Sequence, residues 1–204
     1  ELSQHMSGEV RSRVQQGLLD VGFYLAMPGE LPPEPPALQQ PVLPANPYFF
    51  EGNMAPARAN TAQTAIELGA TALTQFTYKV LAPAGWGPQV QGKDWRALAQ
   101  LPWIVTPSAS AHHRLLQTVM QPLGVTLRRA ALVDQEASML DLVRSGVGLS
   151  LARDTIALRE AQSRGLVIAD RVQLVCHLCF IYNAAQRASP AIAAAQRAVA
   201  KVWT

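Results

Sequence analysis

Strand-like and helix-like segments alternate along most of this sequence, and this alternation constrains the fold more than any other feature. Strands are predicted at residues 76–82, 103–105, 127–133, 147–151 and 172–182, with helices between them. Asp94 can cap the short helix after it, Gly124 and Gly165 follow two of the helices, and Ser189-Pro190 begins the last one. Alternating strands and helices predict an α/β fold, and the breaker cluster at 83–88 is a candidate hinge between two lobes.

The opening of the chain predicts a strand, a helix and a second strand. Residues 2–6 alternate like the end of a strand, and Ser7 can cap the helix that follows. That helix carries Leu18 on its apolar face and has Gly17 in its last turn. Residues 19–25 are predicted to form a buried strand directly after it. A strand–helix–strand unit is typical of a parallel sheet.

A proline-rich segment follows this opening. The prolines between residues 28 and 47 predict an extended surface segment without regular structure. Beyond it, residues 48–50 could form a strand fragment, and residues 60–73 could form a helix.

The composition favours a globular protein with a buried core. Hydrophobic residues make up 49% of the 204 and charged residues only 15%, which excludes an intrinsically disordered chain. No run approaches the roughly 20 uncharged apolar residues of a membrane-spanning helix, so no membrane partner is expected. The N-terminus has no apolar segment behind a basic start, which argues against a signal peptide, although a leader or an upstream domain can precede Glu1. Two cysteines are too few for a disulfide scaffold, and the expected location is cytoplasmic.

The basic residues are scattered along the sequence. The net charge is +3, yet Arg128-Arg129 is the only adjacent pair among the 17 lysines and arginines. A nucleic-acid surface gathers its basic residues on one face or one helix. We therefore do not expect this segment to bind DNA by itself.

The best candidate for a binding site is the segment from Thr106 to His113, which follows a predicted strand and precedes a predicted helix. It therefore lies at the carboxyl end of a strand, where open α/β sheets bind ligands. Free amide groups and the helix dipole favour an anion there, with Thr106, Ser108 and Ser110 as hydroxyl donors. The alternative is that one serine only caps the helix and the other residues face water.

Three further residues belong to the candidate ligand site. His113 could reach an acidic ligand, but His112 and His113 cannot hold one metal ion together because adjacent helical residues point about 100° apart. Tyr24 and Met27 lie near the end of a predicted strand. They could form an apolar wall for the ligand, or they could pack in the core.

The remaining patterns do not indicate catalysis. Cys176 and Cys179 lie within one predicted strand on opposite faces, so they are expected to be buried core thiols. Gly146-x-Gly148 lacks the third glycine of a dinucleotide fingerprint and is expected to turn a helix tightly into a strand. The sequence has no G-x-S-x-G elbow and no close pair of carboxylates suited to acid–base work. We expect no enzyme activity, no metal ion and no cofactor.

Five short segments occur in a telling order. They are Gly17-Leu18-Leu19-Asp20-Val21-Gly22-Phe23, Val80-Leu81-Ala82-Pro83, Asp94-Trp95-xx-Leu98-xxx-Pro102-Trp103-Ile104, Met139-xxx-Val143-xx-Gly146-Val147-Gly148-Leu149-Ser150-Leu151 and Ala188-Ser189-Pro190-Ala191. In order and spacing over residues 7–30 and 77–204, they resemble the effector-binding (regulatory) domain of the bacterial LysR-type transcriptional regulators.

The resemblance implies two Rossmann-like lobes joined by two crossover segments, the type II periplasmic-binding-protein-like fold. Residues 1–87 and 170–204 would form lobe I, and residues 88–169 would form lobe II. A small, anionic effector would bind in the cleft between the lobes, in part through the loop that contains Thr106 to Ser110. Its binding would change, allosterically, how a separate N-terminal winged helix-turn-helix domain, absent from this chain, binds promoter DNA. The family also implies self-association into a homodimer or homotetramer.

The chain departs from the family in two ways. The family's first strand–helix unit has no counterpart before Glu1, and residues 28–76 are longer than the usual link between strands. Residues 48–73 could replace that unit or be a plain insertion, and the sequence leaves both open. The alternative function is an exported solute-binding protein of a transporter, which has the same two-lobe architecture. An upstream helix-turn-helix would favour the regulator, and a leader peptide would favour the transporter component.

Overall fold

The computed structural model describes residues 2–30 and 67–203, and within them it has an α/β fold. The elements in chain order are α1 (Ser7–Gln15), β1 (Val21–Ala26), β2 (Leu68–Ala82), α2 (Gly87–Val90), α3 (Trp95–Ala99), β3 (Pro102–Val105), α4 (Ala111–Leu123), β4 (Arg128–Leu132), α5 (Glu136–Arg144), β5 (Ser150–Arg153), α6 (Asp154–Arg164), β6 (Val167–Asn183), the 3₁₀ helix η1 (Ala184–Gln186) and α7 (Pro190–Trp203). The predicted fold class is confirmed.

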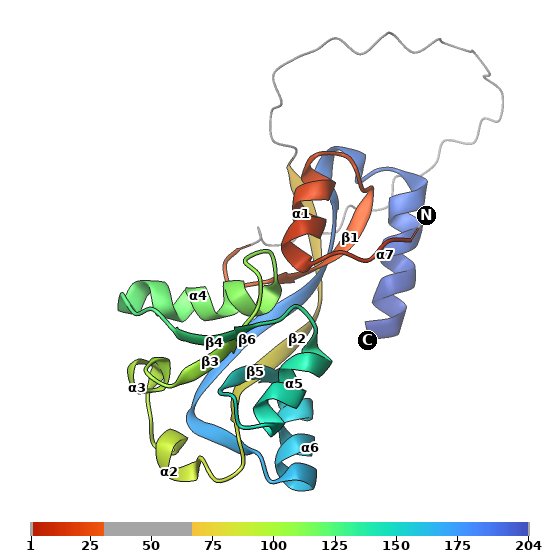
Figure 1. Ribbon diagram of the computed structural model, residues 1–204. Coiled ribbons are helices and arrows are strands. Elements are labelled where there is room, and N and C mark those ends of the chain that lie inside the picture. The colour runs from red at the N-terminus through yellow and green to blue at the C-terminus, as the bar shows by residue number, and fades with distance from the viewer. Residues whose placement is uncertain (1, 31–66, 204) are drawn as a thin grey trace, which may run out of the picture.

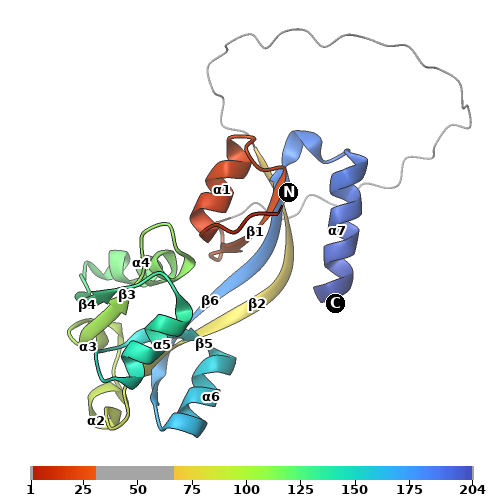
Figure 2. The ribbon, with the colours of Figure 1, turned by 45° about the vertical axis from the view of Figure 1, so that its right-hand side comes forward.

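Two long antiparallel strands, β2 and β6, run through the whole molecule (Figures 1 and 2). They form the middle of a four-stranded sheet with the order β1-β6-β2-β5, in which every pairing is antiparallel. At one end, α1 packs on β1, and α7 packs on β2 and β6. At the other end, α2 to α6 surround β5 and a separate parallel pair of strands, β3 and β4. Both ends are therefore positioned by the same two strands.

Each end of the molecule has its own buried side chains. The core of the larger end includes Trp103, which is fully buried and donates a hydrogen bond from its indole N–H to the Leu98 carbonyl at 2.8 Å. At the other end, alternate residues of β6 face opposite sides of the sheet: Ile181 packs with α1, and Tyr182 packs with α7. The alternation follows from the two-residue period of a strand.

Several predicted helix boundaries are confirmed. The Asp94 carboxylate accepts a hydrogen bond from the Ala97 amide at 2.9 Å and caps α3. Gly124 ends α4 in the left-handed conformation, and Pro190 is the first residue of α7. Gly146 has φ +83°, so the predicted tight turn after α5 is present.

The prediction for the opening of the chain is wrong in four respects. Residues 2–6 form no strand, and β1 pairs antiparallel with β6 where a parallel unit was expected. Ser7 does not cap α1, because it is the first helical residue and its hydroxyl instead accepts a hydrogen bond from the Leu25 amide at 2.9 Å. Leu18 is 65% exposed and lies beyond the end of α1, so it is not on the apolar face of that helix.

The predicted helix at 60–73 is also wrong where it can be compared. Residues 68–73 belong to β2, which pairs with β6 along its whole length, and this pairing overrides the local helical pattern. The remaining part of that prediction, residues 60–66, lies outside the described residues. So do the strand fragment at 48–50 and most of the proline-rich segment. The lobe boundaries at residues 87 and 170 stay predictions. No helix in the described part of the chain is long and apolar enough to cross a membrane.

Replacing Gly148 by alanine tests the close approach of the α5–β5 turn to β3. A Cβ at this position would lie 2.4 Å from the Pro102 carbonyl oxygen, so backbone must shift. We expect Gly148→Ala to lower the free energy of unfolding by about 2 kcal/mol in urea titrations. Gly87→Ala is the matched control, because its Cβ would meet open space. Equal stabilities of the two variants would contradict the close approach.

Candidate functional site

The loop between β3 and α4 contains the predicted hydroxyl residues, and two of the three bond to the protein itself. The Ser110 hydroxyl caps α4 by accepting a hydrogen bond from the His113 amide at 3.1 Å. It also hydrogen-bonds the buried Thr106 hydroxyl. Ser108 is exposed. The capping alternative therefore describes Ser110, and Ser108 is the hydroxyl that faces solvent.

Helix α1 contacts this loop directly. The Gly8 amide donates a hydrogen bond to the Ala109 carbonyl at 2.9 Å. A Cβ on Gly8 would lie 2.8 Å from the same oxygen, which leaves no room for a side chain. The two ends of the molecule therefore touch where α1 meets the β3–α4 loop.

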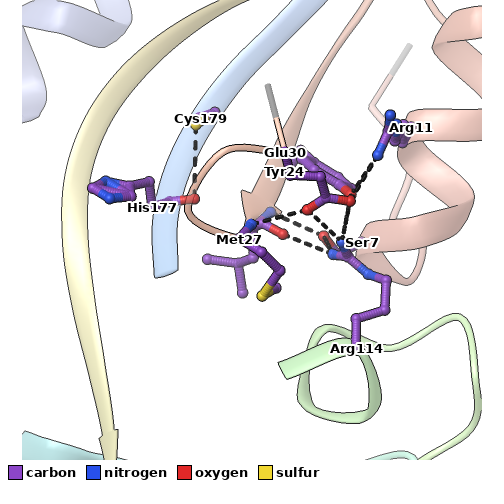
Figure 3. A network of polar contacts seen from close by, with 9 residues as sticks. Ser7, Arg11, Tyr24, Met27, Glu30, Arg114, His177 and Cys179 are labelled. Carbon is purple, nitrogen blue, oxygen red and sulfur yellow. Dashed lines mark hydrogen bonds and ion pairs between the residues drawn. The ribbon is translucent and has the colours of Figure 1, made fainter. Parts of the chain in front are cut away.

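A polar network lies beside this contact and joins α1, β1 and α4 (Figure 3). We call it the Arg114 junction and define it as Ser7, Arg11, Tyr24, Glu30 and Arg114 together with the backbone of Leu25 and Met27. At its centre, the Glu30 carboxylate accepts hydrogen bonds from Arg11 Nη1 at 2.7 Å and from Arg114 Nη1 at 3.1 Å. It is also bonded by the Met27 amide at 2.9 Å and by the Tyr24 hydroxyl.

Arg114 makes the most widely spread contacts of the junction. Its Nη2 donates to the Leu25 carbonyl at 2.7 Å and to the Ser7 hydroxyl at 3.1 Å. Its guanidinium carbon lies 4.5 Å from the centre of the Tyr24 ring, so it also makes a cation–π contact. Its Nε is buried and has no hydrogen-bond partner among the described residues. One α4 side chain thus binds α1, β1 and the turn after β1, and it retains one unused donor.

The junction has an excess of positive charge. Burial by itself would raise the pKa of the Glu30 carboxyl, but the Met27 amide, the Tyr24 hydroxyl and the two arginines together hold that pKa below its usual value. Burial, with the hydrogen bond to Glu30, raises the pKa of Tyr24, so its phenol is neutral at pH 7. Two guanidinium groups therefore face one carboxylate, and the arrangement can accept a further anion.

The structure brings some of the predicted site residues together and separates others. Tyr24 contributes its hydroxyl to the junction, and Met27 contributes its amide while its side chain lies in the core. His113 instead lines a hollow of about 340 Å³. The hollow is lined by Val105, His113, Leu116, Gln117, Met120, Val125, Thr126, Leu127 and Arg129. None of these nine is a member of the Arg114 junction.

Sequence reasoning missed Arg114, Arg11, Glu30 and the role of Ser7. Arg114 lies in the first turns of α4, directly after the candidate loop, so its position was a usable signal. Glu30 is 84 residues away in sequence from Arg114, inside the segment that prolines mark as irregular. No local pattern reports such a contact.

The two cysteines match their predicted role as buried core thiols. Both are free and buried, and they belong to different side-chain clusters on β6. Burial raises the pKa of each thiol to about 11, which keeps it protonated and unreactive at neutral pH. Among the described residues, no group of three His, Cys, Asp or Glu side chains could hold a metal ion.

The fold and the junction define the class of protein: an α/β domain whose two ends share two long strands and meet at a polar, positively charged contact. Residues 60–204 match the family model for the LysR substrate binding domain. The chain therefore belongs to this family, which has the type II periplasmic-binding-protein-like fold, and the resemblance found in the sequence is confirmed. Comparison with curated proteins finds no match.

Solved structures with similar folds include two isolated domains with bound ligands and one full-length regulator. The regulatory domain of CcmR from Synechocystis PCC6803, in complex with 2-PG, has a TM-score of 0.62 at 16% identity, covering 98% of this chain and 80% of that chain. The effector binding domain of QuiR in complex with shikimate gives 0.61 at 11% identity, covering 98% and 79%. Full-length CbnR in complex with its target DNA gives 0.55 at 14% identity, covering all of this chain and 59% of CbnR. At these identities the similarity shows the fold alone.

Truncating Ser110 tests its role as the cap of α4. Ser110→Ala removes the acceptor for the His113 amide and leaves the Thr106 hydroxyl without its partner. We expect the free energy of unfolding to fall by about 1 kcal/mol. Ser108→Ala, two residues away and exposed, should change it by less than about 0.5 kcal/mol. Urea titration of both variants makes the measurement, and a larger loss at Ser108 would contradict the assignment.

His112 should make stability depend on pH. Its Nε2 is buried and has no hydrogen-bond partner in the part of the chain that the structure describes, and its ring packs edge-to-face on Tyr78 with the ring centres 5.1 Å apart. Burial, aided by the charge of Arg153, lowers the pKa of His112 to about 4. As the pH falls below about 6.5, His112 becomes protonated in the unfolded chain, whereas in the folded protein it stays neutral down to about pH 4. Stability should therefore fall across this window as the pH falls, by about 3 kcal/mol.

The measurement compares wild type with His112→Phe, which keeps an aromatic ring against Tyr78. Urea titrations at pH 7, 6, 5 and 4 give the free energy of unfolding at each pH. The difference between the two proteins should shift steadily in favour of His112→Phe as the pH falls. Parallel curves for the two proteins would show that His112 is not the group responsible.

Proposed function

We propose that this chain is the effector-sensing domain of a bacterial LysR-type transcriptional regulator, and that it binds a small organic anion at the Arg114 junction. It is a binding module and not an enzyme. The full regulator is cytoplasmic, associates with itself as a homodimer or homotetramer, and contacts promoter DNA through a separate N-terminal domain. Membership of the LysR substrate binding domain family supports the sensing role. It also favours the regulator over an exported solute-binding protein.

The observation that carries the choice of ligand is the charge of the junction. Among the described residues, Arg11 and Arg114 share the one carboxylate of Glu30, and the buried Nε of Arg114 has no hydrogen-bond partner. Guanidinium groups match carboxylates because two parallel N–H groups can donate to the two oxygens. A small carboxylate is therefore the ligand that this chemistry favours. Shikimate, the ligand in the QuiR complex, is itself a carboxylate.

The loop residues predicted from the sequence lie directly before α4, the helix that carries Arg114. Thr106 and Ser110 fix the start of α4, and through it the position of Arg114. Ser108 is exposed and supplies a hydroxyl to the ligand. Tyr24 and Met27 provide a hydroxyl and an amide next to Arg114, whereas His113 lines the separate hollow described above.

The location of the junction suggests how binding is reported. Arg114 projects from α4, whereas Arg11, Tyr24 and Glu30 belong to the end of the molecule that contains α1 and β1. The Gly8–Ala109 hydrogen bond lies beside them. A ligand that binds these groups differently in two arrangements shifts the balance between the arrangements. Subunit contacts then carry the change to the DNA-binding domains.

Thermal shift against a panel of small carboxylates tests the proposed ligand class. A ligand present at about one hundred times its Kd should stabilise the protein by about 2.7 kcal/mol and raise Tm by several degrees. The matching amides, which have a similar shape and no charge, should have no effect. Absence of a shift with any carboxylate would overturn the assignment of an anionic ligand.

Matched variants locate the site in the same assay. Arg114→Met should abolish the shift, and Ser108→Ala should reduce it. Arg128→Met removes the same charge from an exposed position at the start of β4 and should leave the shift unchanged. If Arg128→Met and Arg114→Met lost the shift equally, the effect would be one of net charge and not of this site.

A further inference from the structure

The Glu30 carboxylate has the surroundings that proteins provide for a bound carboxylate ligand. Arg11 and Arg114 approach it, the Met27 amide donates to one oxygen, and the Tyr24 hydroxyl lies against the other (Figure 3). Both oxygens lie 3.1 Å from the same nitrogen of Arg114. Charge-assisted bonds of this kind are the strong ones in proteins.

Glu30 reaches this position from a turn, whereas its partners sit on regular elements. Residues 27–30 form a tight turn in which the Glu30 amide donates to the Met27 carbonyl at 3.0 Å. Pro28 and Gly29 occupy its central positions, and Gly29 has φ +77°, as a type II turn requires. Arg11 and Arg114 project from α1 and α4, and Tyr24 projects from β1. The groups that bind the carboxylate are therefore held by helices and a strand, whereas Glu30, which supplies the carboxylate, lies in a turn.

We infer that the Glu30 carboxylate fills the anion-binding position in the free protein. A small carboxylate effector then binds Arg114 by displacing the Glu30 side chain. This inference rests on the proposed function and adds the mechanism by which ligand binding changes the structure of the domain. In the free protein, Glu30 ties the turn after β1 to both α1 and α4. In the bound protein, the carboxylate of the effector pairs with Arg114 in place of Glu30, and the turn after β1 is no longer attached to α4.

The number of charged groups in the Arg114 junction is the same before and after the effector carboxylate replaces that of Glu30. Replacing one carboxylate by another preserves the pairing of the two half-buried guanidinium groups in both the free and the bound protein. Arg114 also keeps its bonds to Ser7 and Leu25, which hold its side chain in place whichever carboxylate occupies it. What changes is the attachment of residues 27–30.

Removal of the Glu30 carboxylate should allow a carboxylate from solution to bind at the same position. In Glu30→Ala, acetate can occupy the place of the missing side-chain carboxylate. If Glu30 fills the position in about nine of ten wild-type molecules, the apparent Kd for acetate should fall at least about tenfold in the variant. We would measure it as the acetate dependence of Tm, with sodium chloride at equal ionic strength and acetamide as controls.

Two variants make this test specific. Glu9→Ala removes an exposed carboxylate from the same helix as Arg11 and should leave the acetate affinity at the wild-type value. Glu30→Ala/Arg114→Met should lose the gain. Should Glu30→Ala fail to fold, Glu30→Gln keeps the shape of the side chain, and the Nε–Hε NMR signal of Arg114 reports acetate binding directly.

The outcomes separate this inference from the proposed function. Equal acetate affinities of wild type and the Glu30 variants would overturn the displacement, as would a complete lack of acetate binding by both Glu30→Ala and Glu30→Gln. Neither result touches the wild-type thermal shift with larger carboxylates, on which the proposed function depends. A tenfold or greater gain that is lost with Arg114 supports the displacement.

Discussion

The pairing of β2 with β6 is the constraint on which the rest of the structure depends. The two strands stay paired from Leu68 and Asn183 at one end to Ala82 and Val167 at the other, with two register shifts along the way. Every other part of the fold is placed by this pair: β1 joins the free side of β6, and β5 joins β2. Because both ends share the same two strands, their meeting point is fixed by strand geometry, and α1 reaches the β3–α4 loop.

Local sequence signals predicted the elements whose ends are set by single residues. Asp94 and Ser110 cap helices, Gly124 and Gly146 adopt positive φ, and Pro190 begins α7, because capping and turn chemistry act within a few residues. The predictions failed where pairing with a distant strand determines the secondary structure. Residues 68–73 carry a weak helical pattern, yet they form strand because β6 offers them a continuous partner.

The candidate site divides in the same way. The loop after β3 could be found from sequence because a strand end followed by hydroxyls and a helix is a local pattern. The charge pairing that completes it could not, because Glu30 lies 84 residues from Arg114 and 19 residues from Arg11 in the sequence. Tyr24 shows the limit most clearly. The sequence suggested an apolar wall or core packing, whereas its ring is buried and its hydroxyl joins the charged groups.

The neutral state of Tyr24 decides what the junction can bind. An ionised phenol would balance the second guanidinium and leave no reason for another anion to enter. Burial keeps the phenol protonated, so its hydroxyl donates to Glu30 and the junction retains one net positive charge. The two guanidinium groups are themselves half-buried, so leaving them without an anion would cost free energy, and we expect a carboxylate to be present in either state. A junction that always needs one carboxylate and can exchange its source couples ligand binding to the position of the turn that carries Glu30.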